Sequence, residues 1–152
     1  MYQKIVVPLD GSELAECVFP HIEGLVKACS VREIVFIRVV VPTYPFLGNF
    51  AISEAEVDKV DTERKNRAEK YLRDVLKKLK YEGVKTHAQV LVGGMPESIA
   101  EYCANNKIEM IVIATHGRSG VGKFMIGSIA DRLLRSSSIP VLMVRAPGSL
   151  TT

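Results

Sequence analysis

The sequence lacks the features by which several large classes of protein are identified. Among its 152 residues there is no run of about twenty apolar residues, so no segment is expected to cross a membrane. The net charge is only +3 and the charges are scattered, which argues against a nucleic-acid-binding surface. The first residues lead directly into an apolar run, so no signal peptide is expected.

Cysteine is scarce as well. Cys17, Cys29 and Cys103 are far apart in the sequence and form no CxxC pair. An odd number of separated cysteines predicts buried free thiols in a reducing compartment, so a cytoplasmic location is expected. The sequence also has no HxxxH pattern and no cluster of cysteine with histidine, so no metal site is predicted.

Several motifs of catalysis and dinucleotide binding are missing. There is no GxSxG nucleophile elbow, and no GxGxxG follows the first apolar run. Residues 117–123 fit the first seven positions of a P-loop, but Phe124 stands where a magnesium-binding serine or threonine is required. A true P-loop is therefore disfavoured, and no catalytic residue is predicted.

The sequence does contain a regular alternation of strand and helix patterns. Short apolar runs predict strands, and amphipathic segments between them predict helices. The predicted strands are residues 4–9, 33–41, 85–92, 110–114 and 141–144. The predicted helices are residues 14–29, 53–79, a segment that begins at Pro96, and residues 129–135. We expect one domain over residues 1–152, with a flexible tail over residues 146–152.

This alternation predicts a single doubly wound, Rossmann-like α/β fold. Five parallel strands in the order 3-2-1-4-5 carry helices on both faces of the sheet. The first and fourth strands are then neighbours, and the chains that leave them turn to opposite faces. Ligands bind at such a topological switch point, so Asp10 and the loop at His116 and Gly117 would face each other across a crevice.

Local signals add expectations for two of the helices. Pro20 lies inside the first predicted helix and is expected to kink it. Ser53 and Glu56 match a capping box at the start of the second, and Gly83 is a candidate C-cap at its end. One buried stripe is predicted along that helix, formed by Val57, Val60, Ala68, Leu72, Val75, Leu76 and Leu79.

Two further features have more than one interpretation. Arg38 interrupts the second predicted strand, so it is expected near an edge of the sheet or with its head group in water. Residues 42–51 contain proline, glycine and aromatic residues. They could fold over a ligand, pack on a partner, or form an ordinary surface loop, and the sequence does not separate these interpretations.

The stretch over residues 111–128 carries the most functional information. An apolar run is followed by a glycine-bearing loop, and Gly127 and Ser128 then open a helix. Backbone N–H groups at a helix N-terminus bind anions, and glycine lets a phosphate approach, so the stretch predicts a phosphate site. Arg118 and Lys123 are either phosphate partners or surface charges. The glycines could also serve the turn alone.

Asp10 likewise has two interpretations. It follows the first predicted strand and precedes Gly11 and Ser12. It could cap the helix that follows, or it could contact a ligand at the carboxyl edge of the sheet.

Taken together, these motifs resemble the universal stress protein family over essentially the whole chain. The resemblance is carried by Pro8-Leu9-Asp10, Gly94-Met95-Pro96, Ala114-Thr115-His116-Gly117, then nine residues, Gly127-Ser128, and Ile139-Pro140-Val141. Family members that keep the full loop motif are ATP binders, with a fold like that of adenine nucleotide alpha hydrolases. The resemblance therefore implies an adenine nucleotide, ATP or AMP, with or without Mg, and a homodimer.

The resemblance also implies where the nucleotide would bind. Asp10 and the backbone near Val39 would hold the adenosine, and the loop at His116 and Gly117 together with Gly127 and Ser128 would hold the phosphates. The predicted nucleotide-binding residues are Pro8, Leu9, Asp10, Val39, Ile113, Ala114, His116, Gly117, Arg118, Gly127, Ser128, Ile129 and Ala130. Residues 141–144 form an apolar edge strand that predicts the dimer contact.

One residue departs from the family pattern. Ala114 replaces the first loop glycine. If glycine is needed there for a positive φ or a close approach, affinity falls; if the strand simply continues, alanine is harmless. The functions that remain are a nucleotide-binding regulatory protein, a slow ATP hydrolase, and a dimeric scaffold that no longer binds nucleotide.

Overall fold

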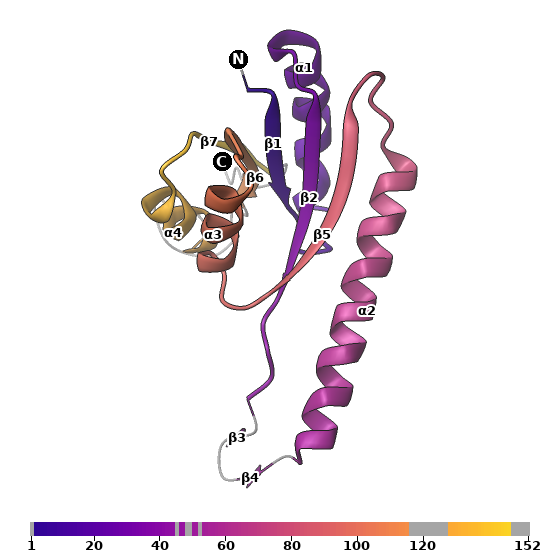
Figure 1. The fold of residues 1–152 in the computed structure, drawn as a ribbon, viewed down its shortest axis with the longest axis vertical. Helices are drawn as coiled ribbons and strands as arrows, with labels where there is room; N and C mark the ends of the chain where they lie inside the picture. The colour runs from indigo at the N-terminus through magenta and orange to yellow at the C-terminus, as the bar shows by residue number, and fades with distance from the viewer. Residues whose placement is uncertain (1, 45, 48–49, 52, 116–127, 147–152) are drawn as a thin grey trace, which may run out of the picture.

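A computed structural model describes the chain except for residues 1, 45, 48–49, 52, 116–127 and 147–152 (Figure 1). Five parallel strands form one sheet in the order β5-β2-β1-β6-β7, which is the predicted order 3-2-1-4-5. The strands are β1 (Lys4–Pro8), β2 (Glu33–Val40), β5 (Lys85–Val92), β6 (Met110–Thr115) and β7 (Val141–Arg145). The predicted fold class is confirmed.

Helices connect the strands, as parallel pairing requires. A short 3-10 turn, η1, precedes the first helix, and a two-stranded antiparallel ribbon precedes the second. The helical elements are η1 (Ala15–Val18), α1 (Phe19–Cys29), α2 (Glu54–Lys78), α3 (Glu97–Asn105) and α4 (Ser128–Ser136). The ribbon strands are β3 (Phe46–Leu47) and β4 (Phe50–Ala51). None of the described helices is long and apolar enough to cross a membrane.

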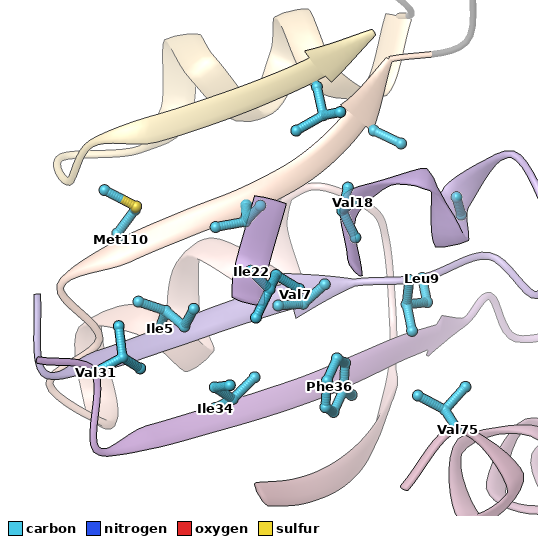
Figure 2. Close-up of a cluster of buried hydrophobic side chains, with 14 of the residues drawn as sticks. Ile5, Val7, Leu9, Val18, Ile22, Val31, Ile34, Phe36, Val75 and Met110 are labelled. Carbon is cyan, nitrogen blue, oxygen red and sulfur yellow. The ribbon is translucent and has the colours of Figure 1, made fainter. Parts of the chain in front are cut away.

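The sheet separates two hydrophobic cores. Alternate residues of β1 and β2 point to opposite faces, and both faces are apolar, as expected for strands covered on both sides. On one face, Val18 of η1, Ile22 of α1 and Val75 of α2 belong to the same buried cluster as Phe36 of β2 (Figure 2). On the other, Ile99 of α3 and Leu133 of α4 belong to the second cluster. The doubly wound architecture follows from these two cores.

The helix signals are only partly confirmed. Pro20 lies in the first turn of α1, where its missing N–H costs no helical hydrogen bond, so the predicted interior kink is wrong. Ser53 and Glu56 form the predicted capping box of α2. Gly83 is not its C-cap, because α2 ends at Lys78 and its C-cap is Leu79; Gly83 lies further on, with φ +73°.

The predicted stripe on α2 is buried along only part of the helix. Ala68, Leu72 and Val75 are buried, whereas Val60 is 37% exposed. The N-terminal half of α2 extends past the end of the sheet, as Figure 1 shows, so its apolar side chains have no strand to cover. Helical periodicity predicts the apolar face, but the length of the sheet decides how much of it is buried.

The C-terminal strand is longer than predicted. β7 includes Arg145, and the N–H of buried Ala146 donates to the carbonyl of Thr115 at 3.2 Å. β7 therefore ends one residue later than predicted, and Ala146 is still hydrogen-bonded to β6. Residues 147–152 lie outside the described chain.

Candidate functional site

The carboxyl ends of β1 and β6 lie side by side at the centre of the sheet. Ile5 pairs with Met110, and Val6 pairs with Ile111. Continued along the strands, this register places residues 9–10 level with residues 114–115. The chain after β1 leads to η1 and α1 on one face of the sheet, whereas the chain after β6 leads to α4 on the other face. The two connections therefore diverge at this point. This is the topological switch point that the sequence predicted.

Asp10 stands where the chain leaves β1. Leu9 is buried, and its N–H donates to the carbonyl of Ile37 at 2.8 Å, so the chain stays attached to β2 up to that point. The Asp10 side chain is then exposed at the edge of the sheet, and its Oδ1 accepts a hydrogen bond from the N–H of Ser12 at 2.8 Å. Ser12 in turn accepts from the N–H of Ala15, through Oγ at 3.1 Å. Asp10 therefore shapes the loop before η1, and its exposed side chain lies at the carboxyl edge of the sheet.

α4 begins at the same edge of the sheet. Its last residue, Ser136, is separated from the start of β7 only by residues 137–140, and β7 begins at the amino edge. A helix of this length rises by roughly 13 Å, so its first turn is directed towards the carboxyl edge. The N-terminal N–H groups of α4 therefore point towards the carboxyl edge of the sheet, where Asp10 also lies.

The structure places the predicted site residues on four elements. Pro8 ends β1 and Val39 lies near the end of β2. Ile113 and Ala114 lie in β6, and both are buried. In α4, Ser128 is the first residue, Ala130 is buried and Ile129 is exposed. His116, Gly117, Arg118, Lys123 and Gly127 lie outside the described residues.

Ala114 continues the strand. It pairs with Val144 of β7, and its side chain is buried in the core that contains α1. Its backbone is therefore extended, and a methyl group there points into the core rather than towards the carboxyl edge. The change from the family's glycine costs this strand nothing in backbone conformation.

The prediction for Arg38 is wrong in part. β2 lies inside the sheet between β5 and β1, so Arg38 is not on an edge strand. Its guanidinium Cζ lies 5.2 Å from the centre of the Tyr71 ring of α2. It also lies against Gly11, because a Cβ added at Gly11 would come within 2.6 Å of Nη1. The sequence signal was an arginine in an otherwise apolar strand, but its partners are distant in the sequence.

Tyr71 is held by charged groups on several elements. Its hydroxyl donates to Oε1 of Glu16 in η1 at 3.1 Å, and Lys78 lies 3.3 Å from Oε2 of the same carboxylate. Burial, the Glu16 carboxylate and Asp10 raise the pKa of Tyr71 far above its usual value, and Arg38 opposes that shift. Tyr71 is therefore a neutral hydrogen-bond donor at physiological pH.

A hollow of about 330 Å³ lies next to the end of β2. It is lined by Val40, Pro42, Asp58, Asp61, Thr62, Lys65 and Val92. Asp61 on its wall accepts from the N–H of Thr43 at 3.0 Å. Within the described part of the chain, no group of three or more histidine, cysteine, aspartate or glutamate side chains could hold a metal ion.

The fold and the switch point define a Rossmann-like α/β protein with its candidate site at the ends of β1 and β6. The model of the family described as Universal stress protein family matches residues 1–145. Universal stress protein MJ0531 of Methanocaldococcus jannaschii is 31% identical over 147 residues, which cover 97% of this chain and 84% of that protein. The chain therefore belongs to the universal stress protein family.

Solved structures of this family have the same fold. MJ0577 of Methanocaldococcus jannaschii superposes with a TM-score of 0.72 at 24% identity, covering 97% of this chain and 99% of that one. A universal stress protein in complex with cAMP has a TM-score of 0.70 at 21% identity, with 95% and 98% coverage. A family protein from Arabidopsis thaliana with AMP bound has a TM-score of 0.63 at 14% identity, with 96% and 93% coverage.

Proposed function

We propose that this protein is an adenine-nucleotide-binding regulatory protein of the universal stress response. The observation that carries the proposal is the juxtaposition of Asp10 at the end of β1 with the end of β6, at the point where the chain diverges. A nucleotide there would meet a carboxylate on one side and the N-terminal N–H groups of α4 on the other. Two structural neighbours, one with cAMP and one with AMP, support an adenine nucleotide as the ligand class.

The proposed site comprises the residues that the family resemblance implies. Asp10 and the backbone near Val39 hold the adenosine, and the loop at His116 and Gly117 together with Gly127 and Ser128 holds the phosphates. The extended backbone at Ala114 is compatible with this arrangement, because its methyl group points away from the ligand edge. ATP and AMP, with or without Mg, are the ligands proposed.

Binding is favoured over hydrolysis. Phosphoryl transfer needs a residue that positions the attacking water and groups that neutralise the phosphoryl charge. Residues 117–123 resemble the start of a P-loop, but Phe124 stands where a magnesium-binding serine or threonine is required. The second candidate, a slow ATP hydrolase, would depend on His116 as the base.

Titration calorimetry with ATP, ADP, AMP and cAMP, each with and without magnesium, tests the proposal. We expect saturable heat for at least one of them, and loss of that heat in Asp10→Ala. No heat at millimolar ligand would refute nucleotide binding and leave the dimeric scaffold. Prolonged incubation with labelled ATP separates the regulatory protein from the hydrolase, because only the hydrolase accumulates labelled ADP and phosphate.

We also propose a homodimer formed through β7. β7 is an edge strand of the sheet, and Val141, Leu142 and Met143 are partly exposed on it. Pairing with the same strand of a second copy would satisfy its outward backbone groups and cover these side chains. A single domain over residues 1–152 and a cytoplasmic location complete the proposal; both rest on the sequence expectations.

A further inference from the structure

A cation from β2 contacts the loop between β1 and η1. Arg38 reaches it from β2, and its guanidinium lies so close to Gly11 that a Cβ there would come within 2.6 Å of Nη1 and 2.9 Å of Cζ. Gly11 has φ +87°, a conformation that suits glycine and leaves its Cα open to a flat neighbour. The guanidinium thus packs directly on the backbone next to Asp10.

The guanidinium is itself held in place. Its Cζ lies 5.2 Å from the centre of the Tyr71 ring, a distance at which a cation and an aromatic face attract each other. The Tyr71 hydroxyl donates to Glu16 at 3.1 Å, and Lys78 lies 3.3 Å from the other oxygen of that carboxylate. α2 and η1 together therefore fix the ring on which Arg38 rests.

Hydrogen bonds between neighbouring residues shape the loop that follows β1. The N–H of Ser12 donates to Asp10 at 2.8 Å, and the N–H of Ala15 donates to Ser12 at 3.1 Å. These bonds join neighbours in the chain and would move with the loop as a unit. The contact between Arg38 and Gly11 relates that unit to β2.

We propose that Arg38 is a positioning residue of the nucleotide site: resting on Tyr71, it sets the placement of the loop of residues 10–12, and with it the Asp10 carboxylate. This inference rests on the proposed function for its effect on affinity, but not for its effect on the loop. Arginine suits the role because its guanidinium is flat and weakly hydrated, whereas a lysine ammonium offers no flat surface to Gly11 and Tyr71.

Amide hydrogen exchange tests the effect on the loop without any ligand. In Arg38→Met we expect the amides of Ser12 and Ala15 to exchange about fivefold faster or more, while those of Val6 and Val7 in β1 keep their rates. Arg38→Lys should behave like Arg38→Met. Arg73→Met is the matched control, because Arg73 is an exposed arginine on the same helix as Tyr71. Unchanged exchange at Ser12 and Ala15 would overturn the proposal.

A double-mutant cycle tests the effect on the site. We expect Arg38→Met to weaken binding of the tightest adenine nucleotide about tenfold, and Asp10→Asn to weaken it as well. If Arg38 acts through Asp10, adding Arg38→Met to Asp10→Asn should change affinity less than about twofold. Two independent losses that simply add would show a general structural role and would overturn the proposal.

Substitutions of Tyr71 test the same proposal through the contact between its ring and Arg38. Tyr71→Phe keeps the ring and loses the bond to Glu16, whereas Tyr71→Leu removes the surface on which Arg38 rests. We expect Tyr71→Leu to reproduce the exchange rates and affinity of Arg38→Met. Tyr71→Phe should change both quantities in the same direction but by a smaller amount. If Arg38→Met does not fold, Arg38→Lys and Tyr71→Leu carry the test. Faster loop exchange in a protein that binds none of the nucleotides would refute the proposed function but keep the role of Arg38 in the loop.

Discussion

The backbone N–H of Leu9 donates to the carbonyl oxygen of Ile37 at 2.8 Å, one residue beyond the end of β1. The parallel ladder between β1 and β2 thus continues to Leu9, whose side chain is buried. The chain leaves the sheet only at Asp10. The backbone that leads to Asp10 is therefore held by the central strands of the sheet up to Leu9.

Asp10 is the residue whose two predicted roles are easiest to separate. Asp10→Asn keeps an oxygen that accepts from Ser12, whereas Asp10→Ala removes it. We expect both variants to lose nucleotide affinity, and Asp10→Ala to lose in addition about 1 kcal/mol of unfolding free energy relative to Asp10→Asn. Calorimetry and urea denaturation measure the two effects. Wild-type affinity in both variants would leave Asp10 with the role in the loop alone.

Ala114 gives a prediction against the family pattern. Its backbone is paired with Val144, and the residue is 7% exposed. Ala114→Gly therefore removes the contacts of a buried methyl group and adds no stabilising interaction. We expect a loss of about 1 kcal/mol in unfolding free energy by urea denaturation and no gain in nucleotide affinity. A tenfold gain in affinity would mean that the glycine serves close approach of the ligand instead.

The fold was predictable because each of its signals is local or periodic. β-branched apolar runs marked the five strands, and the alternation with helices left few topologies for a parallel sheet. The predictions that were wrong concern features that depend on how the elements are placed relative to one another. Val60 and Leu72 both fit the apolar periodicity of α2, but only Leu72 packs on the sheet and is buried. Pro20 similarly fits either inside a helix or in its first turn, and the 3-10 turn before it decided the outcome.

The positions of the candidate site residues in the sequence could be predicted, but the contacts between distant segments could not. Asp10, Val39 and Ala114 were identified from strand ends and from the family motifs. The contact of Arg38 with Tyr71 and Gly11 joins three segments, and no periodicity in any one of them indicates it. An arginine in an apolar strand signals a special environment, but only the structure shows that the environment is the loop before η1.

Edge pairing through β7 can be tested by backbone chemistry. The N–H of Ala146 points to β6, so by strand alternation the N–H groups of Val141 and Met143 point away from the sheet. Val141→Pro removes one of these donors, and Met143→Lys places a charge on the same edge. We expect both to sediment as monomers.

The opposite edge of the sheet supplies the control. Gln89→Lys adds the same charge to β5 and should leave the dimer intact. A dimer that persists in both β7 variants would exclude β7 as the interface, and a wild-type monomer would refute the dimer itself.

The capping box of α2 should stabilise the helix only locally. The N–H of Glu56 donates to Ser53 Oγ at 3.3 Å, and the N–H of Ser53 donates to Glu56 at 3.1 Å. Because this end of α2 extends past the sheet, Ser53→Ala should speed amide exchange over the first turns of α2 about fivefold. The global unfolding free energy should change by less than about 0.5 kcal/mol. A larger global loss would show that this half of the helix belongs to the cooperative core.

Cys103 should make stability fall at alkaline pH. Its side chain in α3 is 5% exposed, and burial raises the pKa of its thiol from 9.0 to about 11. The folded state therefore keeps a proton that the unfolded state releases. This contribution is fully present below pH 9.0 and is lost as pH rises to about 11. It amounts to about 1–2 kcal/mol. Urea denaturation across that range should show a steeper decline in wild type than in Cys103→Ala, where the lost packing lowers stability at every pH. Equal slopes in the two proteins would show that the thiol titrates alike in the folded and unfolded states.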